Sequence, residues 1–246
     1  MDIPRGAADE DGRRAVVHDR SGTLIALDLA DGTVLWRSGS GLRPLALVGG
    51  SVVALRVGTA AVAVLDAADG TERWTSPPLP LPDWARPGLD DSPGFALRTV
   101  PAGPGRVLLR WSARTQYGGG APPDPATLAR RSRESDGGAL LDLTGPDPRL
   151  SPDGPGSGGA GPLEAAAPAP APAADRPAAA PEVLGAEVLG AEVVEARRIG
   201  TRRIELAVPR ATGAVVLRAV DVRSDDPSWE VVLDGAAGRR PPRLRP

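Results

Sequence analysis

One segment of this chain occurs twice at a fixed spacing. ALDLADGTVLW begins at Ala26, and VLDAADGTERW begins 38 residues later at Val64. Both copies alternate apolar and polar residues, pass through an Asp-Gly turn and end on a tryptophan. A repeat of this length indicates a chain built from supersecondary units, each of which needs a neighbour to bury its apolar face.

Alternating apolar runs around the two copies predict strands separated by tight turns. The first repeat contains three such runs, over residues 14–19, 23–29 and 33–38. The second repeat contains four, over residues 44–48, 51–57, 61–67 and 71–75. Successive strands that recur with a period near 40 residues are typical of the blades of a β-propeller.

Two weaker repeats follow the first two. The third has runs over residues 95–100, 106–111 and 139–143, and the fourth has runs over residues 203–208, 215–222 and 229–233. In the third repeat Asp142 takes the place of Asp28, but Leu150 stands eight residues later, where the first repeat has Trp36. The chain is therefore predicted to be all-β, a partial β-propeller of about four blades with a disordered insertion rich in Ala, Pro and Gly.

Composition predicts which parts of the chain remain unfolded. The chain contains 31 Gly and 28 Pro, and stretches of almost pure Ala, Pro and Gly cannot bury enough apolar surface to offset the entropy of ordering. The predicted organisation is a flexible N-terminus (1–12), three blades (13–150) with a loop insertion (112–137), a disordered linker (151–181), a fourth blade (182–236) and a disordered tail (237–246).

The repeated segment resembles the repeat of the pyrroloquinoline-quinone-like, or quinoprotein-dehydrogenase-like, β-propeller family. The resemblance covers about two thirds of the chain. It implies that the tryptophan closing each blade docks against the neighbouring blade, with the turn glycine packed close to it. The structural blade anchors predicted in this way, together with the aspartates before the turns, are Trp36, Trp74, Trp229, Gly32, Gly70, Asp28, Asp66 and Asp221. Trp84 and Trp111 lie outside the motif, and Trp84 is predicted to be a surface residue.

The residues needed for the family's oxidation chemistry are missing. The resemblance implies that its dehydrogenases use a carboxylate beside calcium and, in alcohol-oxidising members, an adjacent cysteine pair, but this chain has no cysteine and no asparagine. His18 is the only histidine, which excludes a site with several histidine ligands. We therefore predict that the chain is not an enzyme and has no catalytic, cofactor-binding or metal site.

Charge and hydropathy limit the partners. A net charge of -2 argues against general binding of nucleic acid, which needs a concentrated positive charge. No apolar run is long enough to span a membrane, and the N-terminus does not resemble a signal peptide. As written the chain reads as cytoplasmic, whereas a signal upstream of Met1 would make it exported.

The predicted function is a non-catalytic PQQ-like β-propeller repeat protein that acts as a protein-interaction or scaffold module. Four blades leave two blade faces uncovered, and faces rich in Val, Leu and Ala would favour a protein partner or self-association. The alternative is a fragment of a quinoprotein-like dehydrogenase or of a propeller that senses a small ligand.

Overall fold

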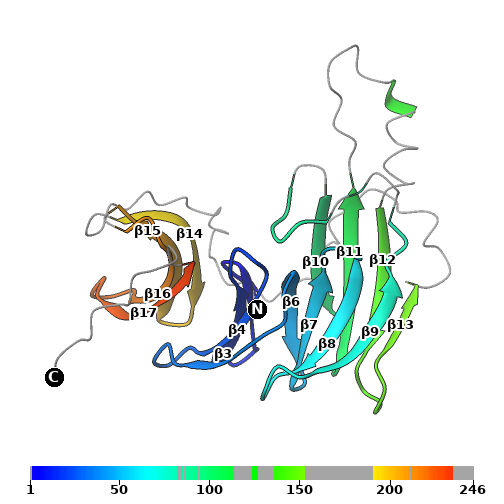
Figure 1. The fold of residues 1–246 in the computed structure, drawn as a ribbon, viewed down its shortest axis with the longest axis horizontal. Helices are drawn as coiled ribbons and strands as arrows, with labels where there is room; N and C mark the ends of the chain where they lie inside the picture. Colours follow the sequence, from blue (N-terminus) through cyan, green and yellow to red (C-terminus); the bar gives the residue numbers. More distant parts are fainter. Residues whose placement is uncertain are drawn as a thin grey trace, which may run out of the picture.

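The alternating apolar runs of the sequence form the strands of four antiparallel sheets in the computed structural model (Figure 1). The structure describes residues 2–81, 85, 87–92, 95–113, 124–126, 136–152, 191–210 and 212–234. Within each sheet the strands follow one another in chain order, so every sheet is a meander that corresponds to one repeat. An all-β partial propeller of about four blades is thereby confirmed.

Each blade is a continuous stretch of the chain. Blade 1 contains β1 (Asp2–Ile3), β2 (Gly6–Ala8), β3 (Arg14–His18), β4 (Leu24–Asp28) and β5 (Val34–Ser38). Blade 2 contains β6 (Leu42–Val48), β7 (Ser51–Arg56), β8 (Ala61–Asp66) and β9 (Glu72–Pro78). Blade 3 contains β10 (Phe95–Pro101), β11 (Arg106–Ala113), β12 (Asp136–Asp142) and β13 (Arg149–Pro152). Blade 4 contains β14 (Ala191–Ile199), β15 (Arg202–Pro209), β16 (Val215–Asp221) and β17 (Pro227–Asp234).

The flexible N-terminus predicted over residues 1–12 is wrong, because this segment supplies the first two strands of blade 1. β2 pairs with β3, and Ala7 and Ala8 are 3% and 0% exposed. A Cβ on Gly6 would lie 2.1 Å from the carbonyl oxygen of Val16, so the pairing requires glycine there. Strands of two and three residues are too short for alternation to be recognised in the sequence.

Other predicted boundaries shift by a few residues or cannot be compared. Ser151 and Pro152 belong to β13 and not to the linker, since they pair with Leu140 and Ala139. The rest of the linker, the tail, Trp84 and most of the loop insertion lie outside the described residues.

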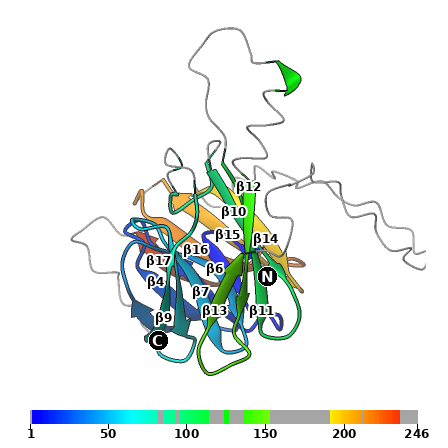
Figure 2. The ribbon, with the colours of Figure 1, turned by 90° about the vertical axis from the view of Figure 1, so that its right-hand side faces the viewer.

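Three hydrophobic cores join the blades in the order 4, 1, 2, 3. One core combines residues of blades 4 and 1, a second those of blades 1 and 2, and a third those of blades 2 and 3. Among the described residues no core cluster joins blade 3 to blade 4. Figure 1 shows blade 4 at one end of the row and blades 2 and 3 at the other, and Figure 2 shows the sheets one behind another. The described blades therefore form an open arc.

Candidate functional site

Two tryptophans make the same contact with the next blade. Trp229 of blade 4 donates its indole N–H to the carbonyl of Leu29 in blade 1 at 3.0 Å, and Trp36 of blade 1 donates to Ala67 of blade 2 at 3.0 Å. A Cβ on Gly32 would lie 2.8 Å from the Trp229 ring, and one on Gly70 would lie 2.6 Å from the Trp36 ring. Each indole therefore lies on the turn glycine of its neighbour, where only a residue without a side chain leaves room.

The other tryptophans of the described residues lie at the interface of blades 2 and 3. Trp74 is partly buried against that core, and its indole N–H has no hydrogen-bond partner in the described part of the chain. The position four residues after Asp142, which corresponds to the turn glycine, is occupied by Pro146. Trp111 is 5% exposed and covers Gly137, with which it pairs across β11 and β12. The contact of Trp74 thus differs from those of Trp36 and Trp229.

The aspartates before the turns bind the backbone. Asp28, Asp66 and Asp221 each accept the backbone N–H two residues later, at 2.7 to 2.8 Å. Asp31 and Asp69 accept the N–H groups of Thr33 and Thr71, and these hydrogen bonds lower the pKa of both carboxyl groups below the usual value. The carboxylates of the repeat hold tight turns in this way.

Leu150 does not occupy the place of a closing tryptophan. In blades 1, 2 and 4 a β-bulge separates the turn from the tryptophan, so that the indole faces the next blade. The β12–β13 pair has no such bulge, and Leu150 packs back toward blade 2. Ser151 lies opposite Leu140 in the sheet, just as Trp36 lies opposite Ala26. By strand pairing, therefore, Ser151 takes the place of the closing tryptophan in blade 3. Spacing along the chain could not reveal this, because the bulge changes which face a residue occupies.

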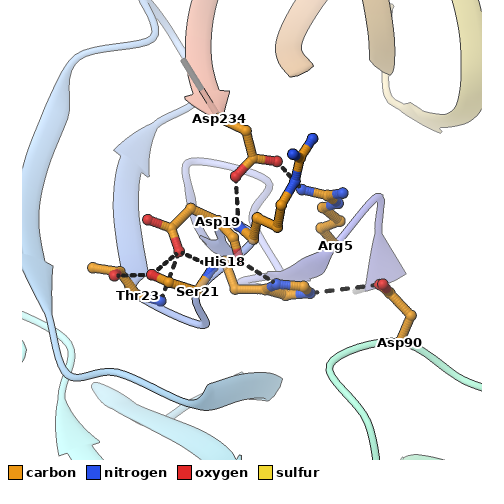
Figure 3. Close-up of polar contacts among 8 residues, drawn as sticks. Arg5, His18, Asp19, Ser21, Thr23, Asp90 and Asp234 are labelled. Carbon is orange, nitrogen blue, oxygen red and sulfur yellow. Dashed lines mark hydrogen bonds and ion pairs between the residues drawn. The ribbon is translucent and has the colours of Figure 1, made fainter. Parts of the chain in front are cut away.

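A polar cluster connects blade 4 to blade 1 (Figure 3). The carboxylate of Asp234, at the end of β17, accepts the Arg5 guanidinium at 2.6 Å and the backbone N–H of Arg20 at 2.5 Å. The side chains of Arg5 and Asp234 are only 18% and 9% exposed, so this ion pair is partly shielded from solvent. Sequence reasoning missed it because the two residues are separated by most of the chain and follow no repeat.

The β3–β4 turn carries the rest of this cluster. Asp19 accepts the backbone N–H groups of Ser21 and Thr23 and the Ser21 hydroxyl, as Figure 3 shows. Burial raises the pKa of Asp19, but these hydrogen bonds outweigh burial and lower the pKa below its usual value. Asp19 therefore stabilises the turn that presents His18 and Arg20.

His18 is buried at the end of β3 and is 2% exposed. Its Nδ1 lies 2.9 Å from the carbonyl oxygen of Asp19, to which it donates in the neutral form, and Nε2 lies 3.7 Å from the Asp90 carboxylate. Burial lowers the pKa of His18, with smaller contributions from the nearby charges of Arg5 and Arg43. One guanidinium nitrogen of Arg43, Nη1, is buried without a hydrogen-bond partner among the described residues. His18 of β3 thus contacts the β3–β4 turn at Asp19 and lies near Asp90 in the segment before β10, and its burial favours the neutral form.

The two end faces of the arc are more polar than the faces between blades. On the outer face of blade 4, Arg203, Glu205 and Arg218 stand where blade 2 has Val52, Ala54 and Ala63. On the outer face of blade 3, Arg110 stands where blade 2 has Leu55. The two end faces therefore combine the expected Val, Leu and Ala residues with charged residues at several positions where the faces between blades are apolar.

No group of three or more histidine, aspartate or glutamate side chains in the described part of the chain is arranged to hold a metal ion. Of the described residues, none forms a helix that is long and apolar enough to cross a membrane.

Residues 4–86 match the family model described as outer membrane protein assembly factor BamB. No curated protein matches the chain. Among solved structures it is similar to BamB from Moraxella catarrhalis, at 14% identity and a TM-score of 0.39, over 94% of this chain and 64% of that one. It is also similar to the β-propeller domain of Cps50 (Swd1) from Myceliophteria thermophila, at 12% identity and a TM-score of 0.36, over 96% of this chain and 58% of that one.

A third similar structure is the dihydro-heme d1 dehydrogenase NirN, at 16% identity and a TM-score of 0.30, over 95% of this chain and 47% of that one. The chain thus spans less than two thirds of the length of these proteins. The family match covers blades 1 and 2, whose turns and closing tryptophans carry the repeat. The resemblance predicted from the sequence is confirmed: these blades are PQQ-like β-propeller repeats.

Proposed function

We propose that this chain is a non-catalytic PQQ-like β-propeller repeat protein that acts as a protein-interaction or scaffold module. The observation that carries the proposal is the open arc of four blades, in which the outer faces of blades 3 and 4 have no core cluster in common. No other blade of the described residues covers the outer face of blade 3, on which Arg98, Val100 and Arg110 are exposed. Extended surfaces of this kind are what repeat architectures use for binding.

The polar groups of the described residues support a binding role over a catalytic one. The repeat aspartates accept backbone N–H groups in turns, and His18 is buried with its Nδ1 bonded to a backbone carbonyl. The family model that residues 4–86 match describes an assembly factor, and an assembly role requires protein contacts.

Site-specific photo-crosslinking tests the proposal. A benzophenone amino acid replaces Val100 on blade 3 or Val232 on blade 4, which are 46% and 44% exposed. Thr59, an exposed residue of the β7–β8 turn away from both faces, is the control position. In cells of the organism that produces the chain, we expect a protein adduct from at least one end face and none from Thr59. Absence of an adduct from both end faces would contradict the proposed function.

A further inference from the structure

We infer that His18 and Asp90 form a proton-dependent contact: when Nε2 of His18 takes up a proton, it binds the Asp90 carboxylate and attaches the segment 87–92 to blade 1. The inference goes beyond the proposed function, because it concerns how the chain responds to pH and requires no partner.

The imidazole of His18 is held in one orientation. It is 2% exposed, its backbone N–H donates to the carbonyl of Arg5 at 3.1 Å, and its Nδ1 lies 2.9 Å from the carbonyl oxygen of Asp19. A carbonyl oxygen can only accept a hydrogen bond, so Nδ1 carries the proton of the neutral ring. Nε2 is then an acceptor without a proton, and Figure 3 shows that it points toward Asp90.

Nε2 and the Asp90 carboxylate therefore face each other as two acceptors. They are 3.7 Å apart, beyond the range of a hydrogen bond, and an ionised carboxylate has no hydrogen to donate to a neutral ring. A proton on Nε2 makes it a charged donor, whose bond to a carboxylate is about 2.7–2.9 Å long. The Asp90 side chain is 69% exposed whereas His18 is buried, so Asp90 is the residue that moves, by about 1 Å.

The segment 87–92 is otherwise attached to blades 2 and 3. Asp91 accepts the guanidinium of Arg43 in β6 at 2.7 Å and the backbone N–H of Leu97 in β10 at 3.1 Å. Ser92 exchanges backbone hydrogen bonds with Phe95, which also belongs to β10. Within the described ranges, Asp90 is thus the residue through which this segment reaches a charged partner in blade 1. Protonation of His18 adds a link between blade 1 and the chain that connects blades 2 and 3.

The surroundings of His18 set the pH at which the contact forms. Burial has the largest influence and lowers the pKa of His18 below the usual value of 6.5. The charges of Arg5 and Arg43 lower this pKa further, while the hydrogen bond to Asp19 and the charge of Asp90 oppose them. The contact is therefore absent near pH 7 and forms as the pH falls below 6.5.

NMR of the only imidazole in the chain tests the proton site. In the full chain labelled with ¹⁵N, we expect the neutral ring to carry its proton on Nδ1. Asp90→Asn should lower the pKa of His18, because it removes the carboxylate that favours the charged form. The control Glu230→Gln removes an exposed carboxylate from blade 4 and should leave that pKa unchanged. A neutral ring with its proton on Nε2, or the same pKa in Asp90→Asn as in wild type, would overturn the inference.

Hydrogen exchange of the full chain tests the attachment. The protection of the amide groups of residues 88–92, corrected for the intrinsic effect of pH on exchange, should increase about twofold to fivefold as His18 takes up its proton. Glu230→Gln should retain this increase and Asp90→Asn should lose it. Protection that decreases instead would mean that the charged imidazole leaves its site. That result, or an equal increase in Asp90→Asn, would overturn the inference and leave the proposed function untouched.

Discussion

Trp229 and Leu29 are 200 residues apart in the sequence, and the indole N–H of the first donates to the backbone carbonyl of the second. The same contact joins Trp36 to Ala67, which lie in consecutive repeats. Blade 4, the last in the chain, therefore packs against blade 1 in the same way that blade 1 packs against blade 2. We propose that these two indoles are the anchors of their interfaces.

Substituting alanine for Gly32 should weaken the interface of blades 4 and 1. Gly32 and Gly50 both have a left-handed backbone, with φ of 77° and 76°, but a Cβ at Gly50 would meet nothing within 4 Å. Both substitutions should cost about 1–2 kcal/mol for the backbone, and Gly32→Ala about 1–3 kcal/mol more because the new methyl group meets Trp229. Urea unfolding followed by circular dichroism measures the difference. Equal losses would contradict the proposed docking.

Trp229→Ala should lower the free energy of unfolding by about 3–5 kcal/mol, since the side chain is 8% exposed at an interface. Trp74→Ala should cost less, because Trp74 is only partly buried and its N–H has no described partner. Trp229→Phe retains most of the ring but removes the donor to Leu29, so it should fall between wild type and Trp229→Ala. Equal effects of the two alanine substitutions would show that the interfaces do not differ.

His18 should make the protein less stable as the pH falls. Burial lowers the folded-state pKa of His18, so below about pH 6.5 the unfolded chain binds a proton that the folded chain does not. The groups that face it are Asp90, which favours the charged form, and Arg5 and Arg43, which disfavour it. Stability should thus decrease as the pH falls from about 7 to 5.

The His18→Gln variant should lose most of that pH dependence, because it has no group that titrates in this range at the site. NMR titration of the only imidazole in the chain measures its pKa directly. A folded-state pKa above 6.5 would contradict the prediction.

Glu205→Gln should be strongly destabilising, by about 3–5 kcal/mol, because it leaves Arg218 buried without its counter-charge. Replacing Arg203, Glu205 and Arg218 together by the Val, Ala and Ala of blade 2 should restore stability. Urea unfolding followed by circular dichroism measures both variants, and a triple variant as unstable as Glu205→Gln would contradict the prediction.

Local patterns in the sequence predict the repeats well. The Asp turns, the glycines and the eight-residue spacing from Asp28 to Trp36 all lie within a few residues of one another, so a single sequence displays them. β1 and β2 escaped recognition because their burial depends on pairing with β3, not on a local alternation. The position of Ser151 depends on a missing bulge, and the Arg5–Asp234 pair depends on how the first and last blades meet.

The blade order 4, 1, 2, 3 means that the chain must travel from one end of the arc to the other between Pro152 and Ala191. None of the three cores uses this connection in the described residues. A gene could gain or lose whole repeats in this connection while every interface between the described blades kept its register. The number of blades in such a chain can therefore change over evolution at this joint, and the arc can lengthen toward a closed ring without redesign of the blades already present.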